Sequence, residues 1–237
     1  TEKGVRRLLS FVKPGVWEYE IEAELMHEFL RNRSKGFAYT PIIASGENAN
    51  VLHYIANNMQ CKDGDVILLD VGAEYANYSS DLTRMIPVNG KFTARQKEIY
   101  NAVLDMKNFA TSLLVPGNNW YDYHKECGEF YTSKFLELGL LDKADVQNQD
   151  KNWPAYKKYM MHGTSHHLGL DTHDYGILKD KFVENMVFTV EPGIYLPAEG
   201  FGVRIEDDVV IQNSGPAFNL MKNIPIEVEE IEELMNS

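Results

Sequence analysis

The chain has 237 residues, of which 44% are hydrophobic and 24% charged, and both fractions are ordinary for a globular protein with a sizeable core. Its formal net charge of −12 argues against binding to nucleic acids, because such proteins rely on Lys and Arg to neutralise phosphates. No apolar run approaches the roughly 20 residues of a membrane-spanning helix, and no signal peptide opens the chain. We therefore expect a cytoplasmic protein without nucleic-acid or membrane partners.

The two cysteines, Cys61 and Cys127, are too few for a disulfide framework and are typical of thiols in a reducing compartment. The chain opens at Thr1, without Met, on a helix-like stretch. We interpret it as a fragment of a longer protein that was cut at a domain boundary.

Taken in chain order, the predicted elements form two similar series. Residues 12–30 contain a Pro-Gly pair, a tryptophan and then apolar residues at helical spacing, and residues 115–135 repeat this order. Thr93 and Gln96 predict a capping box at the start of the helix that precedes the second series.

Strand segments recur in the same two series. One segment starts at Asp65 and the other at Met186, and each has a carboxylate five residues further on, at Asp70 or Glu191. Two diverged copies of a helix–helix–strand–hairpin unit, meeting near residue 110, explain the pattern. We expect one α+β domain over residues 1–237, with halves of about 1–110 and 111–237 in which helices pack on antiparallel sheet.

Residues 66–86 predict a β-hairpin, because apolar runs flank a polar centre. With the loop centred on Tyr75 and Ala76, Asp70 and Asp81 fall directly opposite each other. Cross-strand partners have Cβ atoms roughly 4.5–5.5 Å apart, so these two carboxylates are placed to grip one metal ion or to bridge two.

A second hairpin predicts the same arrangement for Glu191 and Glu206, around a longer loop centred between Ala198 and Glu199. Four carboxylates among apolar neighbours cannot all ionise without a counter-charge. Arg204 lies on the same strand face as Glu206 and can neutralise only one of them. For any single acid an exposed position at a hairpin end is the default interpretation, but the set of four indicates divalent metal ions.

Residues 161–174 hold four of the seven histidines together with two glycines, which favours a loop or irregular strand over a helix. His162 and His166 are therefore not the helical pair of a zinc peptidase. One imidazole with four carboxylates suits Mn, Co, Fe or Zn and disfavours a thiolate zinc site. For His53, a buried core position is the default expectation.

Four motifs resemble, in order, those of the pita-bread metallopeptidases of the M24 type: DVGAEYANYSSDLTR, HGTSHHLGLDTHD, VEPGIY and VRIEDDVVI. The most similar branch is the catalytic C-terminal domain of Xaa-Pro aminopeptidase (aminopeptidase P), with Xaa-Pro dipeptidase (prolidase) near it. The resemblance covers essentially the whole chain. It implies the pita-bread fold with two pseudo-symmetric halves and two divalent ions, for which manganese is the first candidate.

The resemblance also implies a division of labour among five metal ligands. Asp70 would bind one ion, and Asp81 and Glu206 would bridge both. His166 and Glu191 would bind the other ion.

Further roles follow from the same resemblance. Glu191 would act as the general base beside a metal-bridging hydroxide. His173 and His53 would contact the substrate around the scissile carbonyl and the proline, and His162 would line the proline pocket. Arg204 would brace a ligand from outside the metal shell.

The expected function is removal of the N-terminal residue from peptides with proline in second position. Prolidase, which acts on dipeptides only, is the alternative within the same chemistry. A non-catalytic peptide-binding module of this fold would usually have lost ligands, and methionine aminopeptidases have FHE where this chain has the THD that ends at Asp174. A glycosidase with paired carboxylates leaves His166 unexplained. From the resemblance we expect that this chain lacks the amino-terminal domain of the family, and that the full-length protein is a homo-oligomer.

Overall fold

The computed structural model describes residues 1–237. The helices are α1 (Glu2–Phe11), α2 (Glu18–Arg31), α3 (Ala94–Ser112), α4 (Trp120–Glu137), α5 (Lys143–Gln147) and α6 (Val228–Met235). The strands are β1 (Gly36–Phe37), β2 (Ile42–Ser45), β3 (Val66–Asp70), β4 (Ala73–Glu74), β5 (Thr83–Pro87), β6 (Val187–Val190), β7 (Gly193–Leu196), β8 (Phe201–Arg204), β9 (Asp207–Val210) and β10 (Phe218–Asn219). Short 3₁₀ helices are η1 (Gly46–Asn50), η2 (Ala155–Lys158) and η3 (Pro197–Glu199).

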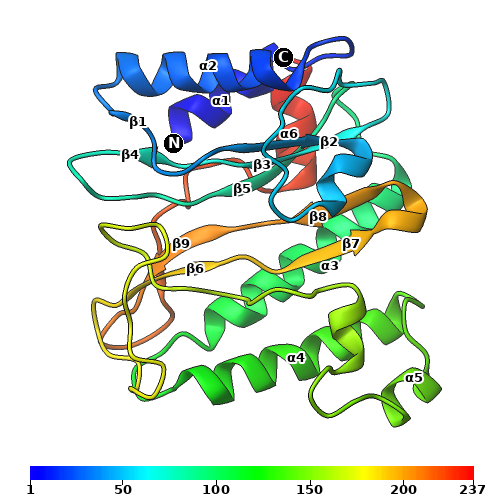
Figure 1. The fold of residues 1–237 in the computed structure, drawn as a ribbon, viewed down its shortest axis with the longest axis vertical. Helices are drawn as coiled ribbons and strands as arrows, with labels where there is room; N and C mark the ends of the chain where they lie inside the picture. The colour runs from blue at the N-terminus through cyan, green and yellow to red at the C-terminus, as the bar shows by residue number, and fades with distance from the viewer.

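Helices cover the sheets from two sides, and the strands lie between them (Figure 1). Helices α1 and α2 lie over the sheet β2-β3-β5, and α3 and α4 lie on the far side of the strands β6 to β9. All strand pairs are antiparallel. The predicted α+β class is therefore confirmed. None of the helices is both long and apolar enough to cross a membrane.

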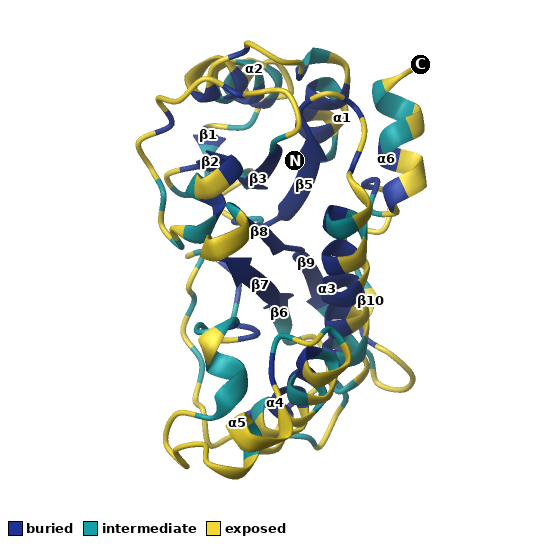
Figure 2. Ribbon diagram, turned by 90° about the vertical axis from the view of Figure 1, so that its right-hand side faces the viewer, coloured by how far each residue is buried: buried dark blue, intermediate teal, exposed yellow.

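The core follows from the near-continuous apolar runs of the central strands. β3 and β5 are buried along almost their whole length, since helices cover one face and the strands of the other half cover the opposite face (Figure 2). Burying each Leu or Ile of these strands contributes about 1.5–3 kcal/mol. The buried inner strands therefore form a rigid platform on which polar side chains at the strand ends are held.

The two predicted series of elements also match in local structure. The glycine of each Pro-Gly pair donates a backbone hydrogen bond to a distant segment. Gly15 donates to the Cys61 carbonyl and Gly117 to the Phe182 carbonyl, both at 2.9 Å. Both glycines have positive φ, 95° and 91°, which other residues rarely adopt. The proposed division near residue 110 falls inside α3, in its last turn, and stays a prediction.

The capping box predicted at Thr93 is confirmed. The Thr93 hydroxyl accepts from the Gln96 amide at 3.2 Å, and the Gln96 side chain accepts from the Thr93 amide at 2.8 Å. These contacts satisfy two donors that a helix start leaves without partners. They fix the start of α3, the helix that precedes the second series.

The register predicted for the first hairpin is wrong. Asp70 pairs with Thr83, not with Asp81, because the turn is formed by Ala76 and Asn77, one residue later than expected. Both turn residues have positive φ, as a tight two-residue hairpin turn requires. Moving the turn centre by one residue moves the partner by two, so Asp81 is a diagonal neighbour on the same face.

The register predicted for the second hairpin is confirmed. Val190 pairs with Asp207 and Gly193 with Arg204, and both pairs are centred between residues 198 and 199. Glu191 and Glu206 lie between these two ladders, directly opposite each other. The ladder is interrupted at this point, where Ile205 donates to the Pro192 carbonyl at 3.3 Å.

A buried ion pair joins the two hairpins. Arg84 of β5 donates to Asp207 of β9 at 2.6 Å and to the Glu206 carbonyl at 2.7 Å. Lys107 of α3 contacts the other oxygen of Asp207. Burial alone would raise the pKa of Asp207, but Arg84 and Lys107 hold it below its usual range. This contact brings the ends of both hairpins together at one place.

Candidate metal centre

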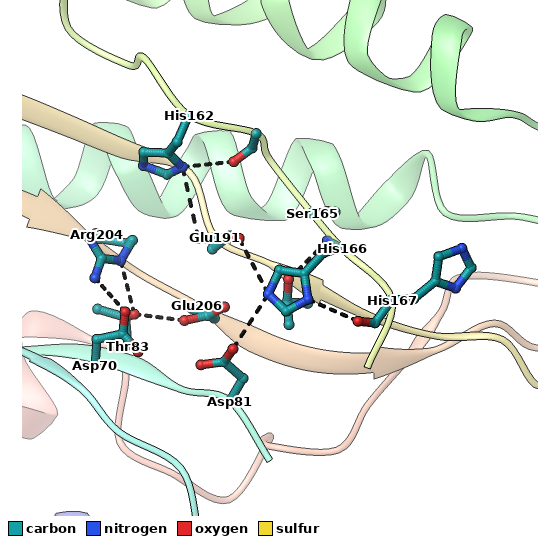
Figure 3. Close-up of polar contacts among 12 residues, drawn as sticks. Asp70, Asp81, Thr83, His162, Ser165, His166, His167, Glu191, Arg204 and Glu206 are labelled. Atoms are coloured by element: carbon teal, nitrogen blue, oxygen red, sulfur yellow. Dashed lines mark hydrogen bonds and ion pairs between the residues drawn. The ribbon is translucent and has the colours of Figure 1, made fainter. Parts of the chain in front are cut away.

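The predicted site residues converge on one cavity of about 740 Å³ between the two hairpins and the 161–174 loop. Its lining includes Asp70, Asp81, Glu191, Glu206, His53, His162, His166, His173, Arg204 and Tyr39. Figure 3 shows the carboxylates of the two hairpins pointing toward one another around His166. The structure therefore brings together all ten residues, of which the two furthest apart in the sequence, Tyr39 and Glu206, are separated by 167 residues.

Three of these residues form the tightest group. One ligand atom from each of Asp81, His166 and Glu206 lies within 4.8 Å of the others. Metal–oxygen and metal–nitrogen bonds of about 2.0–2.2 Å span such a group from a common centre. Asp81 and Glu206 are 5% and 1% exposed, so water contributes little to screening their charge.

His166 is oriented by its backbone neighbour. Its Nδ1 lies 2.9 Å from the His167 carbonyl oxygen, which can only accept, so Nδ1 carries the proton. Nε2 then faces the acids, 3.5 Å from Asp81 and 3.6 Å from Glu191. A carbonyl behind the ring of a ligating histidine is the usual outer partner of a metal site.

Asp70 is held from outside the group. Arg204 donates to it at 2.5 Å and also contacts the Tyr195 hydroxyl at 2.9 Å and Thr83 Oγ1 at 3.2 Å. The Thr83 hydroxyl in turn donates to Glu206 at 2.7 Å. The single arginine of the site therefore pairs with the acid of the other hairpin and reaches Glu206 only through Thr83.

The acids outnumber the positive charges around them. Burial, above all, raises the pKa of Asp70, Glu191 and Glu206, and neighbouring acids raise it further; for Glu191 it reaches about 8. Burial lowers the pKa of His166, but Asp81 and Glu191 outweigh this and raise it. Hard oxygen donors, one imidazole and unbalanced negative charge are the conditions that a divalent cation satisfies. The side chains therefore fit a divalent metal.

The remaining histidines lie around this group. His162 contacts the Gly163 carbonyl at 2.8 Å and the Tyr195 hydroxyl at 2.7 Å, and burial together with Arg204 lowers its pKa to about 3. The rings of His173 and His166 are 4.3 Å apart. His53 is exposed and lines the cavity, so the default expectation of a buried core histidine is wrong.

Sequence reasoning missed four polar residues of the site. The Tyr39 hydroxyl lies 2.6 Å from Asp70 and 2.5 Å from Asp81, in a loop with no recognisable motif. Asp208 accepts from the Asp81 backbone amide at 3.0 Å. Thr83 and Tyr195 could have been found, because each lies an even number of residues from an acid and so shares its strand face.

Comparison with known proteins identifies relatives over most of the chain. Residues 1–213 match the model of metallopeptidase family M24. The chain is 41% identical to the Xaa-Pro aminopeptidase of Haemophilus influenzae, over all of this chain and 57% of that protein. It is 36% identical to the Xaa-Pro dipeptidase of Mus musculus, over 97% of this chain and 55% of that protein.

Solved structures agree with these matches. A zinc-substituted Escherichia coli aminopeptidase P in complex with product superimposes with a TM-score of 0.91 at 38% identity, over all of this chain and 56% of that one. The predicted pita-bread fold is thereby confirmed. The chain spans a little over half the length of the relatives it matches. It belongs to metallopeptidase family M24.

Proposed function

We propose that this M24 chain carries the active site of an Xaa-Pro aminopeptidase, which removes the first residue from peptides with proline in second position. The observation that carries the proposal is the group of four carboxylates, two buried and two half-buried, and one oriented imidazole in a single cavity. The identity of 41% to an Xaa-Pro aminopeptidase supports the proline specificity. We propose further that residues 1–237 form one catalytic domain of a cytoplasmic protein that acts as a homo-oligomer.

We assign five metal ligands within this proposal. Asp70, Asp81, His166, Glu191 and Glu206 would hold two divalent ions, with Asp81 and Glu206 as the ligands that both ions would share. The central trio of Asp81, His166 and Glu206 supports the assignment, since its ligand atoms all lie within 4.8 Å. The donor set favours manganese, with cobalt, zinc and iron as alternatives. Two such ions, when bound, polarise a carbonyl and lower the pKa of water.

The chain's own residues then orient the substrate and move the proton. Glu191 faces the cavity beside His166 and would act as the general base, once bound cations offset the burial that raises its pKa in the metal-free chain. Burial and His166 lower the pKa of His173, so a neutral ring can donate its N–H to the oxygen of the scissile carbonyl as charge develops there.

His162 and His53 bind rather than transfer protons in this proposal. Both ring nitrogens of His162 are engaged by Gly163 and Tyr195, so the ring is fixed and neutral, which suits a wall against the substrate proline. His53 lines the same cavity and belongs to the segment that follows η1.

A comparison of substrate lengths tests the function. The full-length protein, loaded with Mn²⁺, is assayed on Ala-Pro and on Ala-Pro-Ala, with the Asp81→Asn variant as the inactive control. We expect turnover of the tripeptide at a kcat/KM at least tenfold above that of the dipeptide.

Prolidase is the second candidate, because a mouse Xaa-Pro dipeptidase is 36% identical over 97% of the chain. Turnover of Ala-Pro alone would establish prolidase activity in place of the proposed one. Metal binding without cleavage of either peptide would indicate a binding module.

A further inference from the structure

Glu18, the first residue of α2, is completely buried and has no cationic partner. Its carboxylate accepts five hydrogen bonds instead. Burying a carboxylate costs several kcal/mol unless its oxygens are fully hydrogen-bonded, and hydrogen bonds to a charged acceptor are roughly twice as strong as neutral ones. Because the buried carboxylate depends on these hydrogen bonds, it holds its five donors in defined positions.

The donors come from both ends of one segment, residues 45–59. Oε1 accepts from the Ser45 amide at 2.8 Å, the Ser45 hydroxyl at 2.7 Å and the Asn48 side chain at 3.2 Å. Oε2 accepts from the Tyr54 hydroxyl at 2.8 Å and the Met59 amide at 2.9 Å. One carboxylate therefore clamps the start, the middle and the end of the segment onto α2.

The segment has little regular structure of its own to hold it. From Leu52 to Asn58 it is neither helix nor strand, and none of its backbone amides donates a hydrogen bond within the protein. Apart from Glu18, its main polar anchor is Asn57, whose side chain accepts from the Ile43 amide and donates to the Pro41 carbonyl, both at 3.0 Å. The path between these two anchors is set by side-chain contacts.

This segment supplies one wall of the cavity through Leu52, His53 and Ile55. His53 immediately precedes Tyr54, which donates to Glu18. Glu18 itself does not line the cavity. We propose that Glu18 is a positioning residue, which fixes His53 against the substrate through the Tyr54 and Met59 contacts. This inference deepens the proposed function and rests on it.

The substitution Glu18→Gln tests the inference because it keeps the size of the side chain. One oxygen becomes an NH₂ group that cannot accept, so the Met59 amide or the Ser45 amide loses its partner. In the Mn²⁺-loaded full-length protein we expect kcat/KM for Ala-Pro-Ala to fall about tenfold, mainly through KM, with Mn²⁺ binding unchanged.

A double-mutant cycle with His53→Ala separates positioning from general damage. If Glu18 acts through His53, the double variant is within twofold of His53→Ala alone. Glu24→Gln is the matched control, since Glu24 lies on the same helix, pairs with Arg7 and does not contact the segment. A tenfold loss that persists in the His53→Ala background, an equal loss in Glu24→Gln, or no loss in Glu18→Gln would each overturn the proposal.

A second measurement does not depend on peptidase activity. Amide hydrogen exchange at Ser45 and Met59 should be protected in the parent protein and fast at one of the two in Glu18→Gln, with the His53 ring resonance shifted. Unchanged exchange and resonance would overturn the inference, whereas failure of the parent protein to cleave Ala-Pro-Ala would overturn only the proposed function. Should Glu18→Gln not fold, Tyr54→Phe removes a single donor and should lose about threefold in kcat/KM, again only when His53 is present.

Discussion

Replacing Glu191 by Gln should change how the stability of the metal-depleted protein depends on pH. The pKa of Glu191 is raised from 4.5 to about 8, chiefly because the group is buried. A carboxyl whose pKa is higher in the folded state keeps its proton longer when folded, so its ionisation favours unfolding. The contribution of Glu191 to the free energy of unfolding is therefore complete below pH 4.5, the pKa of the unfolded state, and is lost as the pH rises through about 8, the pKa of the folded state.

The magnitude follows from the width of the pH window. One pKa unit corresponds to about 1.4 kcal/mol, so between pH 6.5 and 8 the folded state should lose on the order of 2 kcal/mol through this carboxyl. Histidines with lowered pKa values, such as His162 and His173, titrate below this window and contribute little within it. The raised pKa of His166 acts in the same direction as that of Glu191.

The measurement is urea unfolding at pH 6.5, 7.2 and 8.0 in EDTA, for the parent and for Glu191→Gln. The difference in unfolding free energy between the two should shrink by on the order of 2 kcal/mol from the lowest to the highest pH. Glu199→Gln is the matched control, because the pKa of Glu199 is lowered by Arg95 and its charge is constant in this window. A parent-minus-variant difference that is constant or grows with pH would refute the account of Glu191 as a buried acid.

Three further substitutions test the metal group. Asp81→Asn should abolish Mn²⁺ retention in dialysis and the peptidase activity with it; retention of two ions per chain would contradict the bridging role. Arg204→Lys should weaken Mn²⁺ binding about 10–100-fold in calorimetry, because a lysine cannot contact Asp70, Thr83 and Tyr195 together, and an unchanged Kd would remove the bracing role. Tyr39→Phe should weaken Mn²⁺ binding by about tenfold with little change in unfolding free energy, and a loss of stability with intact binding would make Tyr39 structural.

The sequence predicts the location of the acids better than their pairing. Asp70 and Asp81 were expected to face each other, yet Asp70 pairs with Thr83. Turn chemistry decides this: the chain turns at Ala76 and Asn77, and an alanine with positive φ is not a residue that turn rules select. The carboxylates nevertheless meet, because a shift of the turn centre by one residue leaves every side chain on its original face.

No local sequence pattern predicts the contacts between distant segments. Tyr39 reaches two acids from a loop that is 31 residues before Asp70, and Glu18 clamps a segment that ends 41 residues later. The exposure of His53 depends on that segment lying across the cavity, so its apolar neighbours in the sequence wrongly indicate a core position. The motifs around the acids do predict that the acids share one site, because burial of the adjacent strand residues fixes the face on which each acid lies.

The two hairpins are equivalent in backbone but not in chemistry, and this explains the charge arrangement. In the second hairpin Arg204 is opposite Gly193. In the first hairpin the register of Asp70 with Thr83, which Val71 and Leu82 continue, assigns the corresponding position to Asp81. Equivalent ladder positions thus carry an acid in one half and an arginine in the other. If both carried acids, the cavity would gather five carboxylates and lack its only arginine, so the excess negative charge would be larger still. Since Arg204 pairs with Asp70 across the halves, the broken symmetry leaves Asp81, Glu191 and Glu206 without an arginine or lysine partner.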